Sequence, residues 1–151
     1  VYEVVNNQLC EGNEENMFVT SFMAVITIST GEMEFVNAGH NPQLWMHDGD
    51  TFDWIKTDPG FVLAGLPGIP YVSHKLQLSH GDRIFLYTDG VTEAQNSVRE
   101  LFGEERLLES LNRYGRKPMD QLLPAVRADV DAFVGGAEQF DDITMLAFEY
   151  R

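Results

Sequence analysis

The sequence has very little of several residue types, and each shortage argues against a class of protein. Cys10 is the only cysteine in 151 residues, so no internal disulfide can form and no cysteine–histidine pattern for structural zinc is present. No apolar run approaches the roughly 20 residues that a membrane-spanning helix requires. The first residues carry Glu3 and no basic segment, which does not match a secretory signal peptide. We therefore expect a cytoplasmic location and no membrane segment in these residues.

Basic residues are also scarce. The chain has 10 Lys and Arg against 24 Asp and Glu, which gives a formal net charge of −14 at pH 7. Nucleic acids and anionic membranes are bound through clustered cations, so neither is expected as a partner. The acidity is compatible with a site for a hard cation, because carboxylates that are brought together repel unless a metal neutralises them. It is equally compatible with an ordinary acidic surface.

Several catalytic signatures are absent as well. Neither G-x-x-x-x-G-K nor G-x-G-x-x-G occurs, so neither of these phosphate-binding loops is predicted. No serine lies in a G-x-S-x-G context, which argues against a serine hydrolase. The chain does have 44% hydrophobic and 23% charged residues, a composition typical of one folded domain with a sizeable core.

The pattern of apolar residues changes along the chain. The first residues, 1–10, have a helical period, and a series of strands separated by glycine- and proline-rich turns follows. After Gly90 the period becomes helical again, and the chain closes on an apolar strand. This order favours an α+β fold with antiparallel sheet covered by helices. Strands are predicted at 17–30, 33–36, 43–47, 51–56, 71–78, 84–87 and 142–150, and the later helices at 104–114 and from 118 to about 134.

Two acidic positions lie at the ends of predicted strands. Asp89 follows the strand of residues 84–87 and precedes Gly90, and Asp141 directly precedes the closing strand. If these strands are antiparallel neighbours, the end of one lies beside the start of the other, and the two carboxylates meet at one rim of the sheet. Carboxylates without a His or Cys partner suit Mg²⁺ or Mn²⁺ rather than zinc. On spacing alone, the alternative that Asp89 makes a turn and Asp141 caps a loop is the favoured one.

Other polar residues allow both a functional and a structural interpretation. His40, in N-A-G-H-N-P, is a candidate general acid beside a metal, but a histidine in such a turn more often has a structural role. Glu93 is a candidate third carboxylate, and the preferred alternative is a favourable negative charge in the first turn of a helix. Asp142 is a weaker candidate ligand than Asp141.

The motifs taken together resemble one known family. In chain order they are F-V-T (18–20), N-A-G-H-N-P (37–42), G-D (81–82), L-Y-T-D-G-V-T-E-A (86–94), F-G-x-E-R-L (102–107) and D-D-I-T (141–144). Each motif is weak alone, but together they are similar to the SpoIIE/RsbU branch of the PPM-type, metal-dependent serine/threonine protein phosphatases. The resemblance extends from residue 18 to the end of the chain.

The resemblance implies a fold, a cofactor and an activity. The family fold is an antiparallel β-sandwich flanked by helices, the αββα arrangement, with two Mn²⁺ or Mg²⁺ ions between the sheets. Asp89 matches the aspartate of the T-D-G motif, and Asp141 matches the late metal-binding aspartate. No catalytic side chain beyond the metal-activated water is implied, and no substrate-binding residue is assigned. The implied reaction is hydrolysis of phosphoserine or phosphothreonine on a regulatory protein, such as an anti-sigma-factor antagonist, in bacterial signalling.

The chain also departs from the family pattern. The resemblance implies that the family domain begins with a G-D-x-x-D motif, which supplies the aspartate that bridges the two metals, and a G-D-x-S-G-K-G motif. Neither motif occurs in residues 1–17, ahead of F-V-T. We therefore expect residues 1–151 to be a single domain that lacks its N-terminal strands and first helix, and to be inactive alone. An upstream sensory or receiver domain is expected in the parent chain. The alternative is a degenerate, non-catalytic module for partner binding or homodimer formation, and an exposed sheet edge favours self-association.

Overall fold

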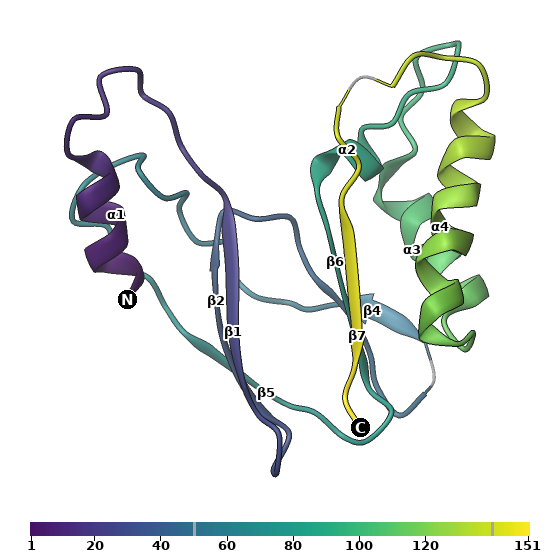
Figure 1. Cartoon of the computed structure of the whole chain (residues 1–151), viewed down its shortest axis with the longest axis horizontal. Helices are drawn as coiled ribbons and strands as arrows, with labels where there is room; N and C mark the ends of the chain where they lie inside the picture. Colours follow the sequence, from purple (N-terminus) through teal and green to yellow (C-terminus); the bar gives the residue numbers. More distant parts are fainter. Residues whose placement is uncertain (50, 140) are drawn as a thin grey trace. The chain divides into compact units, whose positions relative to one another are not determined.

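The computed structural model describes residues 1–49, 51–139 and 141–151 and divides the chain into two units (Figure 1). The first unit comprises residues 1–40 and 56–78, and the second comprises residues 41–55 and 79–151. Each unit contains one antiparallel sheet and its own helices, so the two are described separately.

The first unit contains a three-stranded sheet in the order β1-β2-β5. Its strands are β1 (Ser21–Thr27), β2 (Glu32–Ala38) and β5 (His74–Gln77). The predicted hairpin between β1 and β2 is confirmed, with Ala24 opposite Phe35. β1 is shorter than the predicted strand of residues 17–30, because residues 17–20 form only an isolated bridge between Val19 and Leu63.

Helix α1 (Tyr2–Cys10) is joined to this unit by buried polar contacts. The Tyr2 hydroxyl lies 2.8 Å from the Ser21 hydroxyl, and the Tyr2 side chain lies in a small core with Ala38 and Leu63. The side chain of Asn6 donates to the Leu66 carbonyl at 2.8 Å and accepts from the Ala64 amide at 2.9 Å. Asn6 therefore supplies hydrogen-bond partners to backbone groups of the glycine- and proline-rich loop, which has no continuous strand partner.

The second unit contains a four-stranded sheet in the order β4-β3-β6-β7. Helices α3 and α4 bury their apolar faces in one core with the side chains of Leu44, Phe85 and Tyr87. This core is what fixes the strand ends that carry the predicted ligands. The elements are β3 (Leu44–Met46), β4 (Phe52–Trp54), β6 (Arg83–Tyr87), α2 (Asp89–Thr92), α3 (Gly103–Tyr114), α4 (Met119–Val134) and β7 (Met145–Glu149).

Arg83 connects β6, β7 and the end of α3. Its guanidinium pairs with the Glu149 carboxylate at 2.6 Å, and it donates to the carbonyls of Gly115 and Lys117. Both carbonyls lie just beyond Tyr114, the last residue of α3, where the negative end of the helix dipole favours a cation. The planar guanidinium reaches both groups at once, which a lysine cannot do.

The predicted α+β class is confirmed, since the chain has two antiparallel sheets together with helices. Within the described residues, no helix combines the length and apolar character needed to cross a membrane.

Candidate metal centre

The predicted proximity of the two strand ends is confirmed in the backbone. β6 and β7 are antiparallel neighbours, and Tyr87 at the end of β6 lies opposite Met145 at the start of β7. Asp89 begins α2 just beyond that end of β6, and Asp141 lies in the segment that leads into β7. Both predicted ligands therefore belong to one end of the β6–β7 pair (Figure 1).

Thr88 holds the two motifs together beyond the ladder. Its amide donates to the Thr144 carbonyl at 3.0 Å, and its hydroxyl donates to the Asp142 carbonyl at 3.1 Å. The Thr144 amide in turn donates to the Thr88 hydroxyl oxygen at 3.1 Å. These three bonds join T-D-G directly to D-D-I-T, and we name them the Thr88 clamp. The clamp explains why a threonine precedes Asp89, since a valine of the same shape lacks the hydroxyl.

Gly90 allows the two segments to approach this closely. A Cβ atom added at Gly90 would lie 2.3 Å from the Asp142 carbonyl oxygen, so no other residue fits without moving backbone. The glycine of T-D-G is thus required by the D-D-I-T segment lying against it.

The carboxylates of Asp89 and Asp141 are both exposed and held in similar ways. Asp89 Oδ1 accepts from the Gly90 amide at 3.0 Å, and Asp141 Oδ1 accepts from the Asp142 amide at 2.7 Å. Each carboxylate is therefore oriented by the backbone of the following residue. Asp142 contributes its carbonyl to the Thr88 clamp, and its side chain is exposed.

A small cavity of about 30 Å³ lies beside this end of the sheet, with room for a water-sized group. Gly90, Glu93 and Asp141 are among its lining residues. Glu93 follows the last residue of the four-residue helix α2, so its interpretation as a charge in the first helical turn is wrong. It lies at the wall of the same cavity as Asp141.

His40 belongs to the first unit, where the shape of the N-A-G-H-N-P loop is set by Asn37. The Asn37 side chain accepts from the His40 amide at 2.8 Å and donates to the His40 carbonyl at 2.9 Å. Gly39 has a positive φ of 72° and lies against Val62. A Cβ added at Gly39 would clash with the Val62 side chain. The His40 ring is half-buried, with Nδ1 3.4 Å from the Thr20 hydroxyl.

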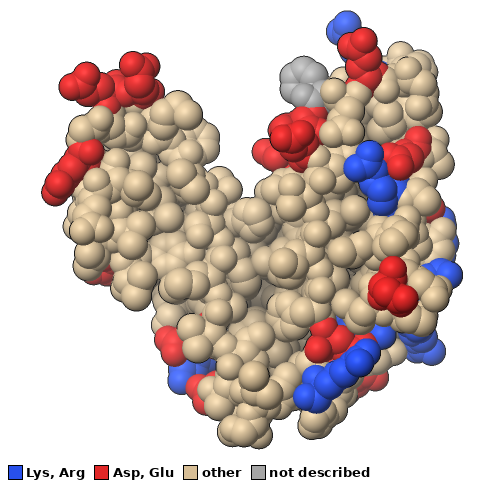
Figure 2. Space-filling view, in the orientation of Figure 1, with Lys and Arg blue, Asp and Glu red and all other residues tan. Residues whose placement is uncertain are grey.

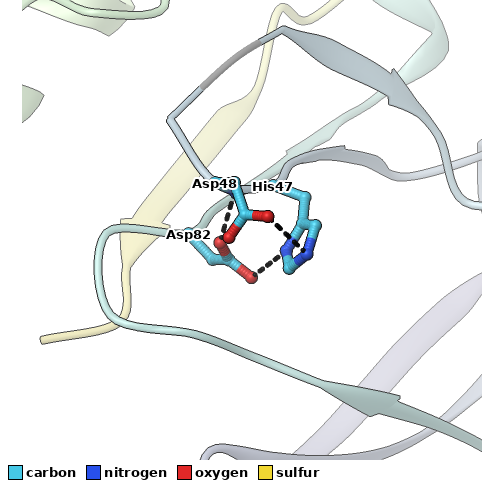
Figure 3. Close-up of side chains that lie close together, drawn as sticks. All are labelled: His47, Asp48 and Asp82. Carbon is cyan, nitrogen blue, oxygen red and sulfur yellow. Dashed lines mark hydrogen bonds and ion pairs between the residues drawn. The ribbon is translucent and has the colours of Figure 1, made fainter.

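A second group of candidate ligands was missed by sequence reasoning. His47, Asp48 and Asp82 place one ligand atom each within 4.8 Å of one another (Figure 3). His47 follows β3, and Asp82 precedes β6, two strands that pair in the sheet. The Gly81–Asp82 pair was part of the family pattern, but nothing in the sequence indicated that His47 would contact it.

The contacts of Asp82 favour a hydrogen-bonded anchor over a metal ligand. Its buried carboxylate accepts from the amides of Ser79 and Asp48 at 3.0 Å each, from Trp45 Nε1 at 3.0 Å and from His47 Nδ1 at 2.9 Å. Burial acts to raise the pKa of Asp82, but these hydrogen bonds together lower it. A cation here would have to displace these N–H groups from the Asp82 carboxylate oxygens. The group of His47, Asp48 and Asp82 therefore does not fit a metal.

We expect His47→Gln to cost more stability in mildly acidic than in alkaline solution. The hydrogen bond to Asp82 raises the pKa of His47, so the folded protein favours the charged imidazole. That contribution is fully present below the unfolded pKa of about 6.5 and is lost as pH rises through the folded pKa. Urea unfolding of both proteins at about pH 5.5 and about pH 8 measures it. An equal difference at both pH values would contradict the assignment.

The chemistry of Asp89 and Asp141 does fit a hard divalent cation. Both are carboxylates, both are exposed, and no basic side chain is paired with either in the ion pairs of the described residues. Mg²⁺ binds through one or two carboxylates while it keeps several waters, and this rim provides such a pair of ligands. Their joint ligation of one ion is a prediction.

Comparison with known proteins agrees with this geometry. The family model of stage II sporulation protein E (SpoIIE) matches residues 1–151. Protein IcfG of Synechocystis is 33% identical over 138 residues, which are 91% of this chain and 21% of that protein. Phosphoserine phosphatase RsbU of Bacillus subtilis is 29% identical over 106 residues, which are 68% of this chain and 32% of that protein. The chain thus spans a fifth to a third of these two relatives.

A solved structure shares the fold. The SiaA-PP2C domain of Pseudomonas aeruginosa superimposes with a TM-score of 0.81 at 20% identity, covering 96% of this chain and 58% of that one. The predicted PPM-type architecture is therefore confirmed. Because the family model matches every residue, the chain belongs to the SpoIIE family.

Proposed function

We propose that these residues are part of a metal-dependent protein phosphatase that removes phosphate from phosphoserine or phosphothreonine of a regulatory protein, such as an anti-sigma-factor antagonist. The observation that carries the proposal is the Thr88 clamp, which joins the two motifs that contain Asp89 and Asp141. Membership of the SpoIIE family and the similarity to a phosphoserine phosphatase support it.

Asp89 and Asp141 would hold Mn²⁺ or Mg²⁺, and the chemistry such an ion would supply is activation of water for hydrolysis of a phosphate ester. The protein's own contribution is positional. The Gly90 and Asp142 amides orient the two carboxylates, and Thr88 fixes the distance between their backbones. Glu93 lines the same small cavity as Asp141 and would add a third carboxylate beside the proposed ligands.

The 151-residue chain alone is expected to be inactive or very weak. Two carboxylates are too few to hold a pair of octahedral ions, and the chain covers 58% of the SiaA-PP2C domain. A bridging aspartate from another part of the parent protein, and a sensory or receiver domain that controls it, belong to the same proposal. Strong phosphatase activity of residues 1–151 alone would contradict the expectation that the site is incomplete. It would not decide whether Asp89 and Asp141 bind the metal.

Metal binding is testable without catalysis. We expect Mn²⁺ to raise the melting temperature of the 151-residue chain, and Asp89→Asn to abolish most of that shift, because a neutral amide is a weaker ligand. Metal at a hundredfold its Kd stabilises by about 2.7 kcal/mol. The matched control is Asp58→Asn, an exposed aspartate in the first unit, which should keep the shift. An Asp89→Asn protein with an unchanged Mn²⁺ response would refute Asp89 as a ligand.

Activity is tested in the full-length parent protein with a phosphorylated antagonist protein as substrate. Asp89→Asn and Asp141→Asn should each lower kcat/KM by about 10²-fold or more, since loss of a charged ligand removes the metal. Normal turnover in both variants would refute the proposed site.

A further inference from the structure

A short hairpin of residues 95–101 follows α2 in the second unit. Gln95 and Leu101 form an antiparallel bridge at its base. Its turn is held by Asn96, whose backbone amide donates to the Glu100 carbonyl at 3.1 Å and whose Oδ1 accepts from the Glu100 amide at 3.0 Å. The shape of the turn is therefore set by hydrogen bonds within the hairpin itself.

Arg99 occupies the position of this turn that glycine normally takes. Its φ is 64°, in the left-handed region, and its amide donates to the Asn96 carbonyl at 2.9 Å. A three-residue hairpin turn of this kind ends in a left-handed residue, which is usually glycine because a Cβ is crowded there. An arginine at this position is strained, and strained residues that persist cluster at functional sites.

The guanidinium of Arg99 has no partner within the chain. Among the residues that the structure describes, Arg99 is the one arginine whose guanidinium makes no hydrogen bond, ion pair or ring contact. The neighbouring carboxylate of Glu100 instead accepts from the side-chain amide of Asn96 at 3.0 Å. A guanidinium presents its N–H donors in a planar fork that matches a carboxylate. Arg99 thus provides a binding group for an anion that the described residues do not supply.

The hairpin lies beside the proposed metal centre. Gln95, at its base, lines the small cavity that Gly90 and Asp141 also line. Glu93 and Glu138 line that cavity as well, so its walls are acidic. Figure 2 shows acidic side chains at this end of the second unit, the end that carries α2, with isolated basic side chains beside them. A protein substrate that reaches the metal centre therefore lies against this hairpin too.

The distance along the hairpin indicates which part of the substrate Arg99 would meet. The turn lies on the order of 10 Å from Gln95, given about 3.3 Å per residue of extended chain. A phosphate held at Asp89 and Asp141 would lie nearer the base of the hairpin, so Arg99 would face residues that flank the phosphorylated one. Carboxylates among those residues are repelled by the acidic cavity walls unless a cation pairs with them.

We propose that Arg99 binds an Asp or Glu side chain that flanks the phosphoserine or phosphothreonine of the protein substrate, and so directs the enzyme to sites in acidic sequence. This inference rests on the proposed function. It makes Arg99 a residue for substrate selection, which does not touch the reacting atoms. Its loss should therefore raise KM for such substrates and leave kcat unchanged.

The test uses the full-length parent protein and phosphoserine peptides that differ only in their flanking residues, which are Glu, Ala or Lys. Wild type should prefer the Glu-flanked peptide to the Ala-flanked one on the order of tenfold in kcat/KM, through KM. Arg99→Gly should remove this preference, and Arg99→Glu should shift it to the Lys-flanked peptide. Hydrolysis of p-nitrophenyl phosphate, which has no flanking residues, should be unchanged in both variants.

A second measurement separates this role from a structural one. Because glycine relieves the strain at a φ of 64°, Arg99→Gly should have the same melting temperature as wild type or a higher one. Arg113→Ala is the matched control, since the Arg113 side chain is 60% exposed at the end of α3 in the same unit. It removes the same charge and should keep the preference for the Glu-flanked peptide.

The outcomes distinguish this inference from the proposed function. A wild-type protein that is inactive on every substrate would contradict the proposed function, and the inference would fall with it. An active wild type without the preference, or a preference that Arg99→Gly leaves intact, would overturn the role of Arg99 alone. If Arg99→Gly also slows hydrolysis of p-nitrophenyl phosphate, Arg99 acts on the phosphate itself and its assignment to a flanking carboxylate is wrong.

Discussion

Replacing Gly90 by alanine is expected to destabilise the second unit by about 2–4 kcal/mol, a large effect for one added methyl group. The new Cβ would lie 2.3 Å from the Asp142 carbonyl oxygen. The position of a Cβ is fixed by the backbone of its own residue, and the Asp142 carbonyl is itself backbone. Neither can rotate away, so the D-D-I-T segment must move. That movement lengthens the Thr88 clamp, so Mn²⁺ binding should weaken together with stability.

Gly136 supplies the matched control. A Cβ at Gly136 meets nothing within 4 Å, and Gly136→Ala should therefore change stability by no more than about 0.5 kcal/mol. Chemical denaturation of the three proteins, with and without Mn²⁺, measures both effects. If Gly90→Ala is as stable as Gly136→Ala, the close packing of T-D-G against D-D-I-T is wrong.

The second large effect is expected at Asp82, where Asp82→Asn should cost about 2–4 kcal/mol of folding free energy. The Asp82 side chain is 0% exposed and its oxygens accept four N–H donors. An amide replaces one of these oxygens by an NH₂ group, which faces donors and leaves at least one of them buried without an acceptor. Trp45, His47 and Ser79 would lose their common anchor.

The pH dependence of this loss distinguishes a carboxylate anchor from a merely space-filling residue. Because its hydrogen bonds lower the pKa of Asp82, its contribution is present above the unfolded pKa of about 3.9 and is lost as pH falls through the folded pKa. The difference between wild type and Asp82→Asn should therefore shrink in acid. Asp53→Asn, an exposed aspartate of the same unit, is the control and should show little difference at any pH. A pH-independent loss would contradict the anchor.

The end-to-end proximity of T-D-G and D-D-I-T could be predicted from the sequence because it follows from chain direction. Once the strands of residues 84–87 and 142–150 are neighbours and antiparallel, the end of one must lie beside the start of the other. Family resemblance selected those two strands from several.

The predicted strand boundaries were less accurate. Residues 17–20 have the composition of a strand but lack a continuous partner strand. Strand pairing depends on the neighbouring strand rather than on composition.

The anchor at Asp82 could not be predicted in the same way. Its donors come from β3, from the segment that follows β3 and from the turn at Ser79, so it exists only once β3 and β6 have paired in one particular register. The same is true of Asn37, whose two bonds to His40 depend on the backbone path of the loop. Side chains that satisfy backbone groups across a turn have no periodic signal, and no spacing rule identifies them.

The Thr88 clamp also joins two segments that lie far apart in the sequence of the second unit. Thr88 and Thr144 are 56 positions apart, and the intervening segment contains α2, α3 and α4. Closing so long a loop has an entropic cost that falls once its helices have folded and shortened the path. The two candidate ligands are held at the same end of the sheet only while β7 is paired with β6, and they separate when β7 detaches. If Asp89 and Asp141 hold the proposed metal, its affinity would depend on β7 staying paired with β6. A parent protein that loosened β7 would then weaken the proposed site without touching either aspartate.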